Sequence, residues 1–219
     1  TTKIINTNVK KIIAVEKDKK LSSFLKNRFK DTKNLEIIND DIFNLIQVEN
    51  FGRNIIVFGN LPYNVSTQIL ASFITINKWP PWYTNLIFMF QKEVADRIIA
   101  KYNTKLYGRL SVISSWKFNI KKITDVTPSS FFPKPKIISS LLEFTPKSNY
   151  IKIESQKNLE KITNVFFNQR RKMIKKPLNI LFNNSTTITK RLSLKGNLRP
   201  QNLSPQLYLK ISKVFEDEL

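Results

Sequence analysis

The sequence predicts an α/β fold in which helices cover a doubly wound sheet and a small helical part follows. Apolar runs of strand length alternate with helix-length segments up to Pro146, and this alternation is typical of such sheets. The sequence is then polar through 148–157, and only helical patterns come after it. Hydrophobic residues make up 41% of the 219 positions, which is enough for a core.

The spacing of apolar residues places the individual elements. Four apolar runs predict buried parallel strands, at 11–15, 35–39, 54–58 and 85–90. Helical spacing predicts helices at 19–29, 67–75, 91–101 and 109–117. Two more strands are expected at 119–126 and 136–144, joined by the proline-rich and therefore stiff segment 128–135. Three helices complete the pattern, at 159–167, 173–182 and 206–215.

These elements divide the chain into an α/β domain over 1–147 and a helical domain over 148–219. The beginning differs from that of an ordinary nucleotide-binding sheet, which opens with a strand and a glycine-rich turn. None of the four glycines forms such a turn near Thr1, which is expected to lie in the first helix. We expect the turn to belong to a section that precedes this sequence. The alternative is a protein that has lost its cofactor loop.

Two residue types are missing from the chain, cysteine and histidine. Their absence excludes disulfides, thiolate nucleophiles, Ser-His catalysis and nearly all zinc sites. Carboxylates, amides, hydroxyls, aromatic rings and backbone groups are left for any chemistry. We therefore expect no bound metal.

The charge is strongly positive, with 37 Lys and Arg against 16 acidic residues, a net charge of +21. Such a field attracts polyanions, so nucleic acid is the expected partner, with an anionic membrane surface as the lesser option. An AT-rich genome would also raise the lysine content, but it does not explain the shortage of acidic residues. Apolar stretches such as 86–90 are too short to cross a bilayer. We expect a soluble, cytoplasmic monomer.

Two acidic residues follow successive predicted strands, where ligands bind in open α/β sheets. Glu16 ends the first strand, and its carboxylate can accept the ribose hydroxyls of an adenosine group. Asp41 follows the second strand and can accept the amine of an adenine, while Ile42 covers the ring. The alternatives are a charge at a helix N-terminus for Glu16 and a helix cap or turn for Asp41.

The segment Asn60-Leu61-Pro62-Tyr63 ends the third predicted strand and is expected to lie in the same cleft. The Asn60 side-chain oxygen and the carbonyl of Leu61 or Pro62 can accept both hydrogens of an adenine amine. A nitrogen held in this way becomes pyramidal and directs its lone pair at a methyl donor. Tyr63 offers an aromatic face for an extruded base. The alternative is an ordinary turn with proline at its second position.

Several longer strings extend this motif. The fourth motif of the small-subunit ribosomal RNA adenine dimethyltransferases resembles FGNLPYNVST (58–67). The next two blocks of that family are similar to FQKEVADRI (90–98) and YGRLSV (107–112). Its eighth motif resembles PSSFFPKPKIISS (128–140), and its helical C-terminal domain resembles NQRRKMIKK (168–176). The blocks occur in family order and cover nearly the whole chain.

The resemblance implies a class I, Rossmann-like methyltransferase domain, incomplete at its N-terminus, and a helical RNA-binding domain. The implied reaction moves methyl groups from S-adenosylmethionine to the N6 amines of two adjacent adenines. These adenines lie near the 3′ end of small-subunit rRNA in a pre-ribosomal particle. Glu16 then holds the cofactor ribose, Asp41 the cofactor adenine, and Asn60 contacts both methyl donor and amine. Tyr63 and Phe131 sandwich the target base.

The sequence departs from the family pattern at two places. The glycine-rich loop that wraps the methionine part of the cofactor is absent from the sequence. Ile138 stands where the family often has an acidic residue, which casts doubt on a polar role there but not on the chemistry.

A run of cations is expected to lie on overlapping helical faces near the C-terminus. The functional interpretation is contact with RNA phosphates, which position an enzyme without reading sequence. The alternative is a solvated helix face. The residues expected to bind RNA are Arg170, Arg171, Lys172, Lys175 and Lys176.

Three other functions compete with this interpretation. One is the related methylase of large-subunit rRNA, against which the YGRLSV block and the basic C-terminal part argue. Another is a ribosome-assembly or nucleic-acid-binding factor that keeps the fold without catalysis. The third, a DNA adenine methyltransferase, usually has two prolines in this motif, so Leu61 argues against it.

Overall fold

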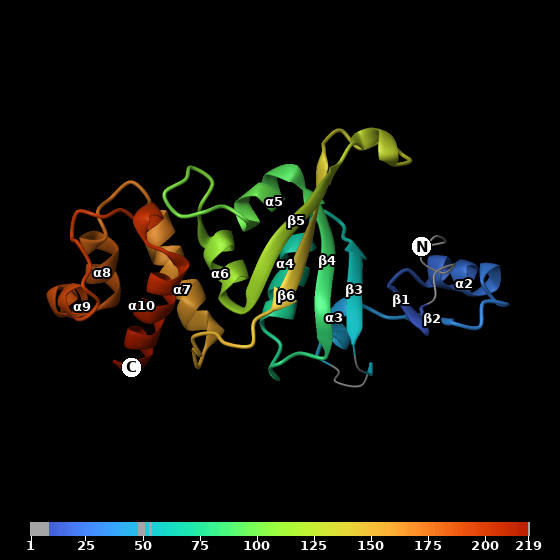
Figure 1. Ribbon diagram of the computed structural model, residues 1–219, viewed down its shortest axis with the longest axis horizontal. Helices are drawn as coiled ribbons and strands as arrows, with labels where there is room; N and C mark the ends of the chain where they lie inside the picture. The colour runs from blue at the N-terminus through green and yellow to red at the C-terminus, as the bar shows by residue number, and fades with distance from the viewer. Residues whose placement is uncertain (1–8, 48–50, 53, 219) are drawn as a thin grey trace. The chain divides into compact units, whose positions relative to one another are not determined.

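The computed structural model describes residues 9–47, 51–52 and 54–218, so the helix expected at Thr1 lies outside them. Two compact units are present, Thr1–Phe51 and Gly52–Leu219. Figure 1 shows strands and helices in both units, with only helices after the last strand. This change falls after Pro146, as the composition predicts, although 52–219 forms one compact unit. A separate domain beginning at 148 stays a prediction.

The first unit contains two parallel strands, β1 (Ile12–Glu16) and β2 (Leu35–Asn39). They pair without a register shift, from Ile12 opposite Leu35 to Glu16 opposite Asn39. Helix α2 (Lys19–Arg28) connects them, and it starts where the Asp18 carboxylate accepts the Leu21 N–H at 2.8 Å. The short helix α3 (Ile42–Leu45) follows β2 and was not predicted, because four residues carry no helical period.

The second unit is built on a four-stranded sheet in the order β3 (Ile55–Asn60), β4 (Tyr83–Gln91), β6 (Ser139–Pro146) and β5 (Phe118–Val126). Strands β3 and β4 are parallel, whereas β6 runs antiparallel to both of its neighbours. The four strands that the apolar runs predict are thus present as two parallel pairs, β1–β2 in the first unit and β3–β4 in the second.

Helices α4 (Ser66–Ile74), α5 (Lys92–Ile98) and α6 (Arg109–Lys117) accompany this sheet, with a 3₁₀ turn η1 at Pro128–Ser130. The sequence predicted α6 at these bounds but carried α5 on to 101. The helix instead ends at Ile98, and the Ile99 N–H closes its last turn on the Ala95 carbonyl. Asn103 then adopts a positive φ of 68° and donates its N–H to the Gln201 carbonyl.

The C-terminal part holds α7 (Gln156–Asn168), α8 (Lys175–Leu181), α9 (Ser185–Arg191), the turn η2 (Pro200–Asn202) and α10 (Pro205–Asp217). Both α7 and α10 pack against α6. The buried Tyr107 hydroxyl, in the loop before α6, donates to the Leu203 carbonyl at 2.9 Å. Helix α9 was not predicted, because Ile188 is its only buried apolar residue and its remaining positions are polar.

The core of the second unit centres on phenylalanine rings from the sheet. Phe144 on β6 lies with its ring centroid 6.1 Å from those of Phe88 and Phe90 on β4 and 5.8 Å from that of Phe118 on β5. Phe73 of α4 covers Phe88 at 5.4 Å. All five side chains are at most 1% exposed. This cluster fixes the strands from which the functional loops emerge.

A carboxylate from α10 completes the N-terminus of α7. Glu216 accepts the Ser155 N–H at 3.0 Å, the Glu154 N–H at 3.1 Å and the Asn158 side-chain amide at 3.0 Å. Its side chain is only 2% exposed, and Lys213 lies 3.8 Å away. Burial works to raise the pKa of Glu216, but these hydrogen bonds and Lys213 outweigh it, so the pKa lies below its ordinary value.

Glu216→Gln is expected to lower the free energy of unfolding at neutral pH by about 1 kcal/mol, because a charge is lost at a helix N-terminus. A carboxyl with a lowered folded-state pKa stabilises fully above its unfolded pKa, and this stabilisation is lost as pH falls through the folded pKa. The difference from wild type should therefore vanish in acid. Urea unfolding at several pH values measures it, with the exposed Glu218→Gln as control. A pH-independent difference would contradict the carboxylate's role.

Candidate active site

The carboxyl ends of β1 and β2 bring the two predicted cofactor carboxylates to one edge of the first unit. Glu16 lies opposite Asn39, whose side-chain amide donates to the Glu16 carbonyl at 2.9 Å. The Asp40 N–H donates to the same carbonyl at 3.2 Å. Asp41 and Ile42 follow at once, so the acidic residues end adjacent parallel strands, as the sequence predicted.

Asp41 also caps α3, which was the alternative interpretation. One of its carboxylate oxygens accepts the Phe43 N–H at 3.1 Å, and the other lies 2.7 Å from the Lys17 ammonium. The hydrogen bond from Lys17 and that from Phe43 lower the pKa of Asp41. The carboxylate is therefore ionised at neutral pH, the state in which it accepts hydrogen bonds from an amine.

The loop from Asn60 to Tyr63 leaves the end of β3 and leads into α4. Asn60 is the last residue of the strand, pairs with Met89 and has an exposed side chain. The Pro62 carbonyl accepts the Val65 N–H at 3.1 Å, which closes a turn. The buried Ser66 hydroxyl donates to the Tyr63 carbonyl at 3.1 Å. This turn has Pro62 at its first position, so it is not the turn with proline at its second position that was the alternative interpretation. Asn60 precedes the turn, at the carboxyl end of a parallel strand.

Gly59 lies directly before this loop, at a position with no room for a side chain. A Cβ there would lie 2.6 Å from Leu61 Cδ2 and 2.9 Å from Phe88 Cδ1. Leu61 can therefore fold back over the strand, with the core ring of Phe88 beneath it. Glycine at this position allows the tight path of the loop.

The two aromatic residues predicted to hold the base both belong to the second unit. Tyr63 is half-buried, and its hydroxyl shares a hydrogen bond with that of Ser139, with 2.8 Å between the oxygens. Phe131 follows η1, is half-buried and donates its N–H to the Pro128 carbonyl at 3.2 Å. The neighbouring Phe132 is fully exposed, at 101%. Ser139 lies within the motif 128–140, but the sequence predicts no role for it.

The predicted site residues thus fall into two sets. Glu16, Asp41 and Ile42 belong to the first unit, and the segment from Asn60 to Tyr63 and Phe131 belong to the second. Each set is assembled as expected at the ends of parallel strands or in the loops between strands. That the two sets share one cleft stays a prediction.

The basic run does not lie on one helix as predicted. Helix α7 ends at Asn168, α8 begins at Lys175, and residues 169–172 form turns between them. Gln169 is the C-cap of α7, and its carbonyl accepts the Lys172 N–H at 2.8 Å. Arg171, Lys172, Lys175 and Lys176 are exposed. The sequence does not reveal this break, because no glycine or proline before Pro177 marks the end of a helix in the basic run.

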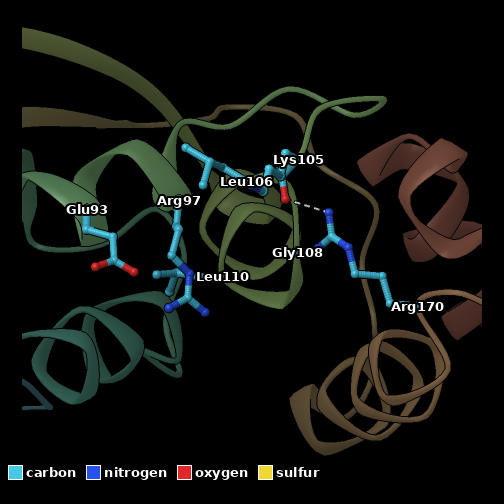
Figure 2. Close-up of a pocket in the computed structure, with 7 residues that line it drawn as sticks. All are labelled: Glu93, Arg97, Lys105, Leu106, Gly108, Leu110 and Arg170. Carbon is cyan, nitrogen blue, oxygen red and sulfur yellow. Dashed lines mark hydrogen bonds between the residues drawn. The ribbon is translucent and has the colours of Figure 1, made fainter.

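Arg170 has a different environment from the other cations. Its guanidinium donates to the carbonyls of Tyr107 at 2.6 Å, Lys105 at 2.6 Å and Thr104 at 3.3 Å. Figure 2 shows the bond to Lys105, beside a pocket of about 210 Å³ that Arg97 and Glu93 also line. Arg170 therefore fastens the loop before α6, and an RNA contact by this residue stays a prediction.

Within 9–47, 51–52 and 54–218, no helix is both long and apolar enough to cross a membrane. The same ranges contain no cluster of three or more acidic residues that could hold a metal ion.

Solved structures with the same fold define the fold class. A dimethyladenosine transferase from Plasmodium falciparum matches with a TM-score of 0.78 at 23% identity, over 95% of this chain and 83% of that one. The 23S rRNA methyltransferase ErmE matches with a TM-score of 0.65 at 16% identity, over 94% of this chain and 82% of that one. The fold is that of the Rossmann-like methyltransferases, as the sequence predicted.

Sequence comparison narrows the class to a family. Residues 1–217 match the family described as ribosomal RNA adenine dimethylase, and the chain belongs to it. A "Ribosomal RNA small subunit methyltransferase A" of Pelagibacter ubique (strain HTCC1062) is 52% identical over 217 residues, which cover 99% of this chain and 82% of that protein. The protein of the same name from Zymomonas mobilis subsp. mobilis is 37% identical, over 94% of this chain and 74% of that protein.

Proposed function

We propose that this protein transfers methyl groups from S-adenosylmethionine to the N6 amines of two adjacent adenines near the 3′ end of small-subunit rRNA. Its substrate is the rRNA in a pre-ribosomal particle, so it acts in the cytoplasm. The observation that carries the proposal is the loop from Asn60 to Tyr63, which places an amide, carbonyls and an aromatic ring at the end of a parallel strand. Family membership supports the choice of substrate.

Glu16 and Asp41 would hold the adenosine part of the cofactor. They end adjacent strands, and the Asp41 carboxylate is ionised at neutral pH, which suits an adenine amine as hydrogen-bond donor. Ile42, half-buried at the start of α3, would cover the adenine ring. The cofactor, when bound, supplies an electrophilic methyl group on a sulfonium. Two carboxylate acceptors and an apolar side chain fit the hydroxyls, amine and ring of its adenosine part.

The Asn60 side-chain oxygen and one backbone carbonyl would accept the two hydrogens of the target amine. The Pro62 carbonyl already accepts the Val65 N–H, which favours the Leu61 carbonyl for this role. Two acceptors in fixed positions favour a pyramidal nitrogen, whose lone pair is then available for attack. A general base of high pKa is not needed, which suits a chain without histidine.

Tyr63 and Phe131 would stack on the two faces of the flipped adenine. The exposed cations Arg171, Lys172, Lys175 and Lys176 would bind RNA phosphates and position the enzyme. The high positive charge of the chain supports such binding.

Transfer of labelled methyl groups to purified ribosomal particles tests the proposal. The full-length protein is expected to modify immature small subunits and to leave large subunits unlabelled, with label recovered as N6-methylated adenine. Label in large-subunit rRNA would support the rival methylase. A protein that binds small subunits without labelling them would be a non-catalytic assembly factor.

Replacing Arg171, Lys172, Lys175 and Lys176 together with glutamine is expected to weaken binding to small-subunit rRNA. The plot of log affinity against log salt concentration has a negative slope, and each lost phosphate contact makes it less steep by about 0.7–0.9. Filter binding at several salt concentrations measures this slope. The matched control replaces four exposed lysines of the first unit with glutamine, which removes the same charge: Lys19, Lys20, Lys26 and Lys30. Equal losses in both variants would show that only the overall charge matters.

A further inference from the structure

We infer that Ser139 is a positioning residue, which fixes the ring of Tyr63 against the target base and ties it to the segment that carries Phe131. The inference rests on the proposed function, because it concerns how the adenine is held. It adds a residue to the site that acts through Tyr63 and touches neither substrate nor cofactor.

The first support is the hydrogen bond itself. The hydroxyl oxygens of Tyr63 and Ser139 lie 2.8 Å apart, although the residues are 76 positions apart in the chain. Ser139 is fully buried, and Tyr63 is half-buried. The tyrosine carbonyl is held by Ser66 at one end of the residue, and the hydroxyl is held by Ser139 at the other. With its backbone carbonyl and its ring hydroxyl both held, Tyr63 has little freedom to rotate its ring away from a stacked base.

The second support is that Ser139 belongs to a rigid part of the sheet. It is the first residue of β6, and it lies opposite Gln91 on β4 and Val126 on β5. Its backbone is therefore flanked by strands on both sides and cannot shift independently of them. The anchor that Tyr63 uses is a fixed point of the fold.

The third support concerns the segment 127–138, which carries Phe131 and joins β5 to β6. Both of its ends are fastened. Asp125, at the end of β5, accepts the Ser140 hydroxyl at 2.5 Å and pairs with Lys122 at 2.6 Å. At the other end, the Ile138 carbonyl accepts the Lys92 N–H at 3.0 Å. Tyr63 thus binds the residue at which this segment re-enters the sheet.

These three observations connect the two aromatic faces of the proposed clamp. Tyr63 approaches from the loop after β3, Phe131 from the loop before β6, and Ser139 is the junction between them. Loss of the Ser139 hydroxyl should loosen the Tyr63 ring without removing any group that binds RNA. The expected defect is in the methyl-transfer step, because small displacements of reacting groups lower rates strongly.

Ser139→Ala, Tyr63→Phe and the double variant, assayed for methylation of small-subunit particles, test the inference. Each single variant is expected to lower kcat about tenfold or more while leaving KM for the particle nearly unchanged. Because both changes remove the same bond, the double variant should be no slower than the slower single variant. Ser139→Thr keeps the hydroxyl and should restore kcat.

Ser140→Ala is the matched control. Ser140 is as buried as Ser139 and adjacent to it in β6, but its side chain points to the opposite face and binds Asp125. In this background Tyr63→Phe should still have its full effect, since a different bond has been removed. Unfolding midpoints of all variants separate loss of stability from loss of rate.

Wild-type kcat for Ser139→Ala, or losses that multiply in the double variant, would overturn the inference. If Ser139→Ala fails to fold, Tyr63→Phe provides the test, because it removes the same hydrogen bond through the half-buried Tyr63. Wild-type kcat for Tyr63→Phe would also overturn the inference. The proposed function fails separately, through undiminished methylation by Asn60→Ala.

Discussion

Asn60→Ala is expected to lower the rate of methyl transfer to small-subunit particles by about 100- to 1000-fold. A preorganised group aimed at charge that develops in the transition state is worth about this much in rate. The alanine variant loses the side-chain oxygen that would accept an amine hydrogen, while the Leu61 carbonyl is retained. Asn60→Asp keeps an acceptor at the same place and should retain more activity than Asn60→Ala.

The fold should survive this change, because the Asn60 side chain is exposed and β3 pairs through its backbone. We expect the free energy of unfolding to change by no more than about 0.5 kcal/mol. Single-turnover methylation and urea unfolding measure the two effects. Asn119→Ala, an exposed asparagine on β5, is the matched control and should leave both unchanged. Normal turnover by Asn60→Ala would refute the proposed mechanism.

Phe144→Ala is expected to lower the free energy of unfolding by about 3–5 kcal/mol, the cost of truncating a fully buried phenylalanine. Phe144 is on β6, between β4 and β5, and its ring contacts those of Phe88, Phe90 and Phe118. Its loss leaves a cavity at the centre of the sheet that these rings cannot close without leaving their rotamers. Such a loss is a large share of a typical domain's stability of about 5–15 kcal/mol.

Guanidinium unfolding, with the midpoint and the slope both recorded, measures the loss. Phe132→Ala makes the same chemical change at a fully exposed ring and should alter stability by no more than about 0.5 kcal/mol. Phe144→Leu keeps most of the volume and should cost about 1.5 kcal/mol or less. A Phe144→Ala variant as stable as Phe132→Ala would show that the ring cluster is not the core.

Most of the element order could be predicted from the sequence, because apolar period and length are local properties. Strand 35–39 and helix 109–117 have the predicted bounds, and the other predicted strands and helices differ by a few residues at their ends. The short helices α3 and α9 were missed since neither has enough apolar positions to show a period. The place of β6 between β4 and β5 depends on long-range pairing, which no local pattern encodes.

Among the predicted site residues, the sequence correctly placed those whose position depends only on the end of a strand. Glu16, Asp41 and Asn60 each end or follow a predicted parallel strand, and the structure has them there. The sequence predicted where the basic run lies but placed it on one helix, whereas α7 ends at Asn168 and α8 begins at Lys175. The three carbonyls around Arg170 belong to residues 63, 65 and 66 positions away in the chain, so only the tertiary structure shows these contacts.

The sequence by itself determined the α/β class, the order of the elements and which functional groups stand in the loop from Asn60 to Tyr63. These follow from hydrophobic periodicity and from residue types in a row, which are present in the chain before it folds. Only the tertiary structure decided which side chains meet: Tyr63 with Ser139, Glu216 with the start of α7, and Arg170 with the loop before α6. Such partners depend on strand register and helix packing, and those are fixed when distant segments bury their apolar faces together.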